Sequence, residues 1–153
     1  MVEQLPPLQL EAWQGFLRAH YAIVRALDAV LIRRVGLSLS AFEVLRWLER
    51  EPETGLRMSD LADLVLLSRS GVTRLVDQLE ARGLLRRVRC ETDQRGYSAV
   101  ITSDGCEALA AAADVHFREV QAIFTGRLDD DDLAALVRIL GRVASQAEKA
   151  PDC

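Results

Sequence analysis

The segment from Arg57 to Gly105 constrains the fold of this chain most strongly, because several local patterns follow one another within it in a fixed order. A short helix is expected from about Ser59 to Leu66, with a buried side made of Leu61, Ala62 and Val65. Ser68 can cap a second helix whose apolar residues stand at 72, 75, 76 and 79, which is the spacing of one helix face. Gly83 is placed to stop that helix. The sequence therefore predicts two helices joined by a tight turn.

A basic hairpin is expected directly after the second helix. Leu84 to Cys90 and Tyr97 to Thr102 have the composition of strands, joined by a charged tip that contains Asp93, Arg95 and Gly96. Positions 69 to 97 hold seven arginines and four acidic residues, a net charge of +3, whereas the whole chain has a formal net charge of −4. A localised basic segment on an acidic body is typical of a protein that meets phosphates through one face only.

Two amphipathic helices are expected before this segment. From Leu10 to Leu31, bulky residues recur at heptad spacing, at 10, 13, 17, 20, 24, 27 and 31, which predicts a long helix that needs a partner. Gly36 should end it. Ser40 is expected to cap the next helix, with Glu43 three residues later as in a capping box, and that helix should run to about Arg50. Its apolar residues are Phe42, Leu45, Trp47 and Leu48.

Two further helices are expected after the hairpin. Thr102 can cap the first of them and Gly126 is expected to end it. The last helix opens on four aspartates, 129 to 132, and has one apolar stripe at 133, 136, 137, 140, 143 and 144. Negative side chains are stabilised at a helix N-terminus, which has a partial positive charge. We therefore interpret the aspartate run as the start of a helix, and a metal site is the alternative.

The rest of the composition limits the class of protein. No apolar run is long enough to span a membrane and no basic leader precedes an apolar segment, so we expect a cytoplasmic protein. Cys90, Cys106 and Cys153 form neither a disulfide framework nor a metal pair, and Cys90 is either a redox sensor beside two arginines or inert. The sequence offers no plausible catalytic set of serine or cysteine with histidine, so an enzyme is not expected.

The polar face of the second helix is the candidate binding surface. When its apolar residues face the core, Ser70, Thr73, Arg74 and Asp77 project outward. Arg74 can bond bidentately to guanine, Thr73 can contact a thymine methyl or a phosphate, and Arg69 lies where backbone N–H groups attract phosphate. An ordinary solvated helix with surface arginines is the alternative.

Several fragments occur in an order that is more specific than any one of them. They are Leu61–Ala62, Ser68–Asp77, Leu79–Leu84, Asp93–Gly96 and Ile101–Gly105. In this order they resemble the multiple-antibiotic-resistance regulator (MarR) family of winged helix-turn-helix repressors. The resemblance covers nearly the whole chain and implies a mainly α fold with a small β-hairpin wing.

The resemblance also implies an organisation and a partner. Residues 1–36 would form an N-terminal dimerisation helix, 37–102 a DNA-binding lobe, and 103–153 C-terminal dimerisation helices. The homodimer would bind a pseudo-palindromic operator in double-stranded DNA, with the second helix in the major groove. Contacts are expected from Ser68, Arg69, Ser70, Thr73 and Arg74, while Arg95 enters the minor groove and Asp93 orients the wing by pairing with an arginine.

The signal to which such a repressor responds is less constrained. Leu10 to Arg34 contains no cysteine, unlike the peroxide-sensing members, and two isolated histidines match the metal-sensing members poorly. No cofactor is expected, and a small aromatic or phenolic effector remains, with Trp13, His20 and His116 as candidate ligands. His20 lies on an apolar stripe and therefore needs a partner or a ligand, and a hydrogen-bonded interface histidine is the alternative.

The sequence thus predicts a dimeric, sequence-specific transcriptional regulator, expected to be a ligand-responsive repressor. The alternative is a winged-helix module for protein contacts that does not bind DNA. Such a module needs no arginine at the wing tip and tolerates an acidic recognition face.

Overall fold

The computed structural model describes residues 5–65, 67–90 and 93–147, and side chains at 90, 93–95, 146 and 147 are outside the description. The elements are α1 (Pro7–Val35), α2 (Leu39–Glu49), β1 (Leu56–Arg57), α3 (Met58–Leu64), α4 (Arg69–Ala81), β2 (Leu85–Cys90), β3 (Asp93–Ile101), α5 (Ser103–Ile123), a 3₁₀ turn (Thr125–Arg127) and α6 (Asp130–Ala147). The expected mainly α fold with a small β wing is confirmed. The chain forms two compact units, 1–117 and 118–153.

Helix α1 begins with a proline in its first turn and ends where the sequence predicts. Gly36 has φ 67° and ψ 21°, and its N–H donates to the carbonyl of Ile32. This left-handed conformation costs glycine little, because it has no Cβ. The buried residues of α1 are Leu27 and Leu31, both in its C-terminal third, so most of its apolar stripe is exposed within the single chain.

Helix α2 begins two residues before the predicted position. Ser38, not Ser40, is the N-cap: its backbone is extended and its Oγ accepts a hydrogen bond from Ala41 N at 3.1 Å. Asp28 of α1 accepts a second bond, from Leu39 N at 2.8 Å. The predicted capping box at Ser40 and Glu43 is therefore wrong, because Ser38 supplies the cap and the Asp28 carboxylate accepts a further bond at the first helical residue.

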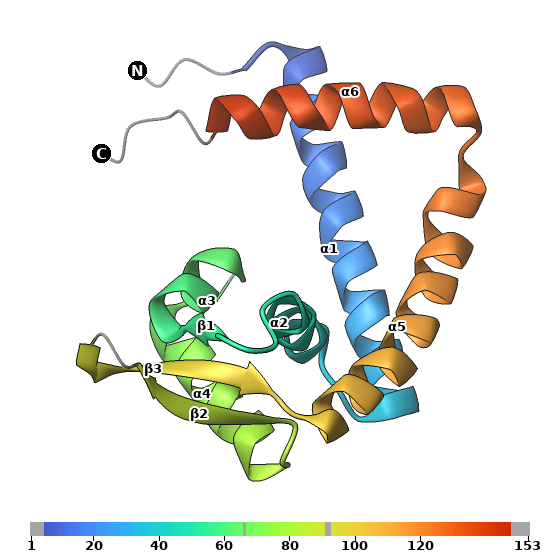
Figure 1. The fold of residues 1–153 in the computed structure, drawn as a ribbon. Helices are drawn as coiled ribbons and strands as arrows, with labels where there is room; N and C mark the ends of the chain where they lie inside the picture. The colour runs from blue at the N-terminus through green and yellow to red at the C-terminus, as the bar shows by residue number, and fades with distance from the viewer. Residues whose placement is uncertain (1–4, 66, 91–92, 148–153) are drawn as a thin grey trace. The chain divides into compact units, whose positions relative to one another are not determined.

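Helices α2, α3 and α4 gather around a three-stranded antiparallel sheet in the order β1-β3-β2 (Figure 1). The two-residue strand β1 was not predicted, and it pairs Leu56 with Ala99. Strand β3 begins at Asp93, not at Tyr97, so the predicted tip residues through Gly96 belong to the strand backbone. The register of β3 against β2 shifts between Arg89 and Cys90. Because of this irregularity, the residues at the start of β3 do not follow the strict alternation by which a strand is predicted from sequence.

One apolar core holds this lobe together. Its largest fully buried side chains include Leu31, Phe42, Leu45, Leu48, Leu61 and Leu79. Helix α3 ends at Leu64, before the expected Leu66, and Val65 is extended yet buried. Helix α4 buries Val72, Val76 and Leu79 while Leu75 is partly buried, which confirms the predicted face.

The start of α5 is seated against the turn after α4. Thr102 Oγ1 accepts a hydrogen bond from Gly105 N at 3.0 Å and donates one to the carbonyl of Gly83 at 2.6 Å, so the predicted cap is confirmed. Gly105 is buried, and a Cβ there would stand 2.0 Å from the carbonyl oxygen of Leu84.

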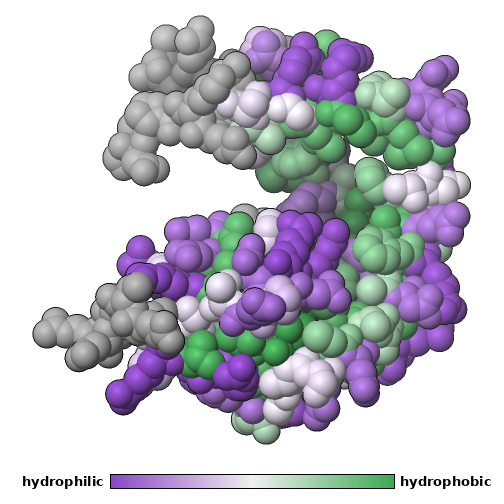
Figure 2. All heavy atoms as spheres, in the orientation of Figure 1, coloured by the Kyte–Doolittle hydropathy of each residue, from purple (hydrophilic) through white to green (hydrophobic). Residues whose placement is uncertain are grey.

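The C-terminal part differs from expectation at one boundary. Helix α5 ends at Ile123, not at Gly126, which lies within the 3₁₀ turn. Asp129 Oδ1 accepts from Asp132 N at 2.8 Å, so the aspartate run begins a helix as predicted. Hydrophobic side chains are visible on the surface of α6 (Figure 2), where Val137 is 75% exposed. None of the described helices is long and apolar enough to cross a membrane.

Candidate nucleic-acid interface

The N-terminus of α4 is fixed by its own sequence. Ser68 is extended, and its Oγ accepts a hydrogen bond from Gly71 N at 3.1 Å and lies 3.2 Å from Ser70 Oγ. A Cβ at Gly71 would stand 3.2 Å from that same hydroxyl, so glycine lets the cap approach closely. The Ser68 hydroxyl is therefore occupied in capping, which gives it an orienting role in addition to the predicted contact.

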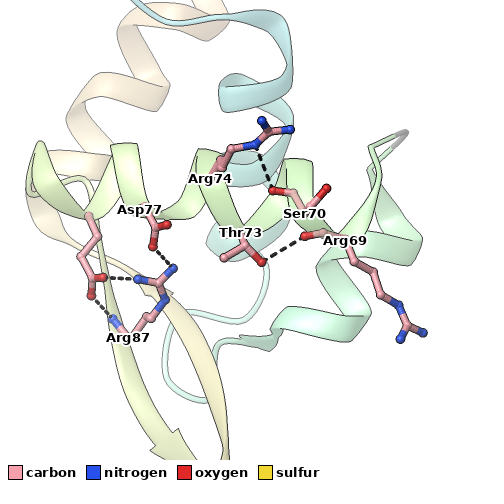
Figure 3. Close-up of polar contacts among 7 residues, drawn as sticks. Arg69, Ser70, Thr73, Arg74, Asp77 and Arg87 are labelled. Carbon is pink, nitrogen blue, oxygen red and sulfur yellow. Dashed lines mark hydrogen bonds and ion pairs between the residues drawn. The ribbon is translucent and has the colours of Figure 1, made fainter.

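The predicted contact residues occupy the exposed face of α4. Arg69, Ser70, Thr73 and Arg74 are all exposed. Thr73 Oγ1 donates to the carbonyl of Arg69 at 3.0 Å, and Arg74 Nε donates to the carbonyl of Ser70 at 3.3 Å (Figure 3). The bond from Nε orients the Arg74 guanidinium while its terminal nitrogens point away from the helix, and Arg69 extends clear of it (Figure 3). Two arginines are thus presented with geometry suited to acceptors outside the protein.

An ion-pair cluster joins α4 to the wing. Arg87 of β2 contacts Asp77 at 2.5 Å and Glu80 at 2.6 Å, and its backbone N donates to Glu80 Oε1 at 2.8 Å (Figure 3). Burial alone would lower the pKa of Arg87, but the hydrogen bonds and charges of the two carboxylates outweigh it and raise that pKa. We name these three residues the Arg87 clamp. Within the clamp, the positive charge of Arg87 compensates the carboxylate of Asp77. Without this ion pair, Asp77 would place an uncompensated negative charge on the exposed face of α4, where it would repel phosphate.

A hollow of about 580 Å³ lies between α3, α4 and the wing strands. Its lining includes Arg57, Ser59, Thr73 and Tyr97 together with residues of the clamp. The sequence analysis missed Arg57, Ser59 and Tyr97, because they lie on three different elements that only the fold brings together. Tyr97 is 43% exposed, so its ring is open to solvent at the rim of this hollow.

The wing residues of the prediction fall partly outside the description. Asp93 and Arg95 belong to β3 by backbone, and their side chains lie outside the described residues, as does the side chain of Cys90. The expected pairing of Asp93 with an arginine therefore stays a prediction. The Arg87 clamp supplies a described anchor between wing and helix that the sequence analysis did not foresee.

The candidate effector residues lie on two helices. Trp13, 52% exposed, stacks on Phe16, and Phe16 stacks on His20, with centroid distances of 6.1 Å and 6.2 Å. His20 also lines a hollow of about 430 Å³ between α1 and α2, together with Val24, Arg25, Asp28, Leu39, Ser40 and Glu43. Burial raises the pKa of Glu43, against a smaller opposing effect of Arg46.

His116 occupies a different environment on α5. Its ring stacks on Phe42 at 4.6 Å, and its Nδ1 is buried without a hydrogen-bond partner in the described structure. Burial, and secondarily the charge of Arg46, lowers the pKa of His116. Among the described hollows, none is lined by Trp13, His20 and His116 together.

The short helix α3, the capped helix α4 and the β2–β3 hairpin that follows define a winged helix-turn-helix protein. Residues 35–96 match the family model of the MarR family. The transcriptional regulatory protein for the hcr operon of Thauera aromatica is 30% identical over 134 residues, which cover 88% of this chain and 79% of that protein. The chain belongs to the MarR family of transcriptional regulators.

Solved structures agree with this assignment. AbsC, a MarR family transcriptional regulator from Streptomyces coelicolor, is 29% identical with a TM-score of 0.86, and the match covers 97% of this chain and all of AbsC. A second MarR family regulator of that organism, Sco3205, was solved in complex with DNA. It is 27% identical with a TM-score of 0.88, over 98% of this chain and 93% of Sco3205.

Proposed function

We propose that this protein is a homodimeric, sequence-specific repressor that places α4 in the major groove and the wing in the adjacent minor groove. The observation that carries the proposal is the exposed face of Arg69, Ser70, Thr73 and Arg74, on which bonds to the helix backbone orient the side chains of Thr73 and Arg74. A guanidinium held in this way can donate two hydrogen bonds to guanine O6 and N7. Because DNA is the proposed partner, we place the protein in the cytoplasm.

Charge supports DNA over a protein partner for this face. Asp77 is the acidic residue among the predicted outward residues of α4. Its carboxylate is compensated by the guanidinium of Arg87, at 2.5 Å. The face thus presents uncompensated arginines and a neutralised carboxylate, which suits a polyanion. A winged-helix module that binds another protein would have no need for this arrangement.

The decisive experiment is binding of the purified protein to its own upstream intergenic DNA across a salt series, with competitor DNA present. We expect binding that weakens with salt and survives competitor. Arg74→Ala and Arg95→Ala should each cost roughly 1–3 kcal/mol of binding and relax sequence preference, as expected for base-contacting arginines. Arg138→Ala on α6 removes the same charge outside the winged-helix lobe and should bind as the wild type does. Equal affinity of all four proteins would favour the protein-contact module.

The apolar stripes of α1 and α6 support the dimer. Large side chains on both helices are exposed within the single chain, among them Leu8, Trp13, Phe16, Val137 and Val143. An exposed apolar stripe along a helix marks an interaction site, and each of these two helices can be covered by helices of a second copy of the chain. We therefore assign 1–36 and 103–153 to dimerisation and 37–102 to DNA binding.

The dimer can be tested on α6 alone. Val137→Glu places a charge in the middle of the stripe and should shift the protein toward monomer in sedimentation equilibrium. Arg138→Glu lies on the polar face of the same helix and should leave the dimer intact. A monomeric wild type at micromolar concentration would contradict the assignment.

We further propose that a small aromatic or phenolic effector releases the repressor from DNA. The hollow beside His20 has a size suited to a small ligand and a mixed apolar and charged lining. Hydroxybenzoates are a suitable probe series. An active compound should lower DNA affinity in the wild type and act more weakly on His20→Ala or Trp13→Ala, and the same comparison with His116→Gln tests the third candidate. No release by any compound of the series would contradict this part of the proposal.

A further inference from the structure

We propose that Arg82 is a positioning residue that holds the recognition helix α4 against the end of α1 and thereby sets the separation of the two recognition helices in the dimer. This inference rests on the proposed function, since it concerns how a dimer presents two copies of α4 to one operator. Arg82 was not among the predicted contact residues, and it lies at the C-cap of α4.

The link is a direct hydrogen bond between segments far apart in sequence. Arg82 Nη1 donates to the carbonyl oxygen of Gly36 at 2.9 Å, across 46 residues. Gly36 is the left-handed C-cap of α1, so its carbonyl belongs to a helix end, where carbonyls lack partners within the helix. The partial negative charge of a helix C-terminus favours a guanidinium there. The sequence thus provides both the acceptor and a cation suited to it.

Apolar contacts alone do not define the orientation of the C-terminal half of α4 relative to α1. Leu79 of α4 and Leu31 of α1 share one apolar core, but such contacts have little directional preference. Beside the bond lies a hollow of about 430 Å³, lined by Gly36, Ser38, Leu75, Gln78 and Arg82 among others. Val76 and Leu79 are buried on the core side of this half of α4, and the hollow leaves the side toward the junction of α1 and α2 open at the surface. A hydrogen bond requires a defined distance and angle, so it can fix what the apolar contacts leave free.

A small rotation at this point has a large effect at the DNA-contacting end. Helix α4 has 13 residues, with Arg69 at one end and Arg82 directly after the other. At 1.5 Å per residue it is about 20 Å long, so a tilt of about 10° about its C-terminus displaces Arg69 by roughly 3 Å. Such a displacement exceeds the tolerance of a hydrogen bond to a base edge. In a two-fold dimer the change occurs twice and alters the half-site spacing that fits.

The test compares Arg82→Met and Arg82→Lys with the wild type on the operator that the binding experiment proposed above identifies, and on versions with one base pair inserted or removed between the half-sites. Arg33→Met is the matched control. It removes an exposed arginine from the last turn of α1, the helix whose C-cap carbonyl accepts the bond from Arg82. Circular dichroism and sedimentation check that each variant is a folded dimer. Should Arg82→Met fail this check, Arg82→Gln replaces it, with the same expected outcomes.

We expect Arg82→Met to bind the native spacing about tenfold more weakly, to lose most of its preference among the three spacings, and to keep the wild-type salt slope. Arg82→Lys should retain the preference, since an ammonium can donate to the same carbonyl, and Arg33→Met should match the wild type. An unchanged spacing preference overturns the inference. A salt slope reduced by about one at every spacing does so too, because it identifies Arg82 as a phosphate contact. A wild type that binds none of these DNAs refutes the proposed function itself.

Discussion

Replacing Arg87 by methionine tests the link between α4 and the wing, because methionine keeps much of the apolar stem and removes the guanidinium. Arg87 is 22% exposed, whereas Asp77 and Glu80 are 57% and 36% exposed. Ion pairs this accessible are worth about 0.2–1 kcal/mol each. Glu80 keeps its bond to the backbone N–H of Arg87, which a side-chain change leaves in place. We therefore expect Arg87→Met to lower the free energy of unfolding by about 1–2 kcal/mol.

The effect on DNA binding should be larger than this stability change indicates. Without the guanidinium, two carboxylates on the DNA-binding lobe become uncompensated, and the wing loses a polar anchor to α4. We expect DNA affinity to fall at least about tenfold, the size of a single charge-assisted hydrogen bond. Asp77→Asn in the Arg87→Met background removes one of the exposed charges and should recover part of that loss.

A double-mutant cycle with Asp77→Asn and Arg87→Met gives the decisive measurement. Urea unfolding and DNA binding of the four proteins should yield a coupling energy of about 0.5–1 kcal/mol for stability, smaller in 1 M salt. A coupling energy of zero in both assays would show that the contact contributes nothing to the fold or to binding. DNA affinity unaffected by Arg87→Met would refute the argument that the clamp orients the wing.

Three further predictions test the structural account. Gly105→Ala should cost about 2 kcal/mol of stability in urea unfolding, because its Cβ would stand 2.0 Å from the Leu84 carbonyl oxygen; Gly15→Ala, with no heavy atom within 4 Å, should instead be neutral or stabilising. Ser68→Ala should cost about 1 kcal/mol by loss of the α4 cap, and an unchanged unfolding midpoint would count against the cap. Burial and the charge of Arg46 lower the pKa of His116, so the unfolded state binds more protons as the pH falls through about 6.5, and stability should decrease there; His116→Gln should flatten this dependence between about pH 7.5 and 5.5, and an unchanged pH profile would contradict the prediction.

The sequence by itself determined the features that depend on residues within one or two helical turns. The apolar positions of α4 and the Ser68 cap follow from spacings of three and four residues, and Gly36 and Thr102 mark helix ends by their own conformational or hydrogen-bonding properties. The winged helix-turn-helix fold could be predicted because each of its elements leaves a local pattern, and these patterns follow one another along the chain in the order of the fold. The outward face of Ser70, Thr73 and Arg74 followed from the same periodicity.

Tertiary structure decided whatever depends on residues distant in sequence. Asp28 accepts a bond from Leu39 at the start of α2, eleven residues away in sequence, and no local pattern around Ser38 and Ser40 indicates this partner. The two-residue strand β1 exists only because β3 passes beside it, and it is too short to leave a periodic pattern. Arg87 was one of seven arginines in a basic segment, and only its position opposite Asp77 and Glu80 shows that it compensates carboxylates of the protein. A charged side chain reaches several neighbours in a fold, and sequence spacing alone does not choose among them.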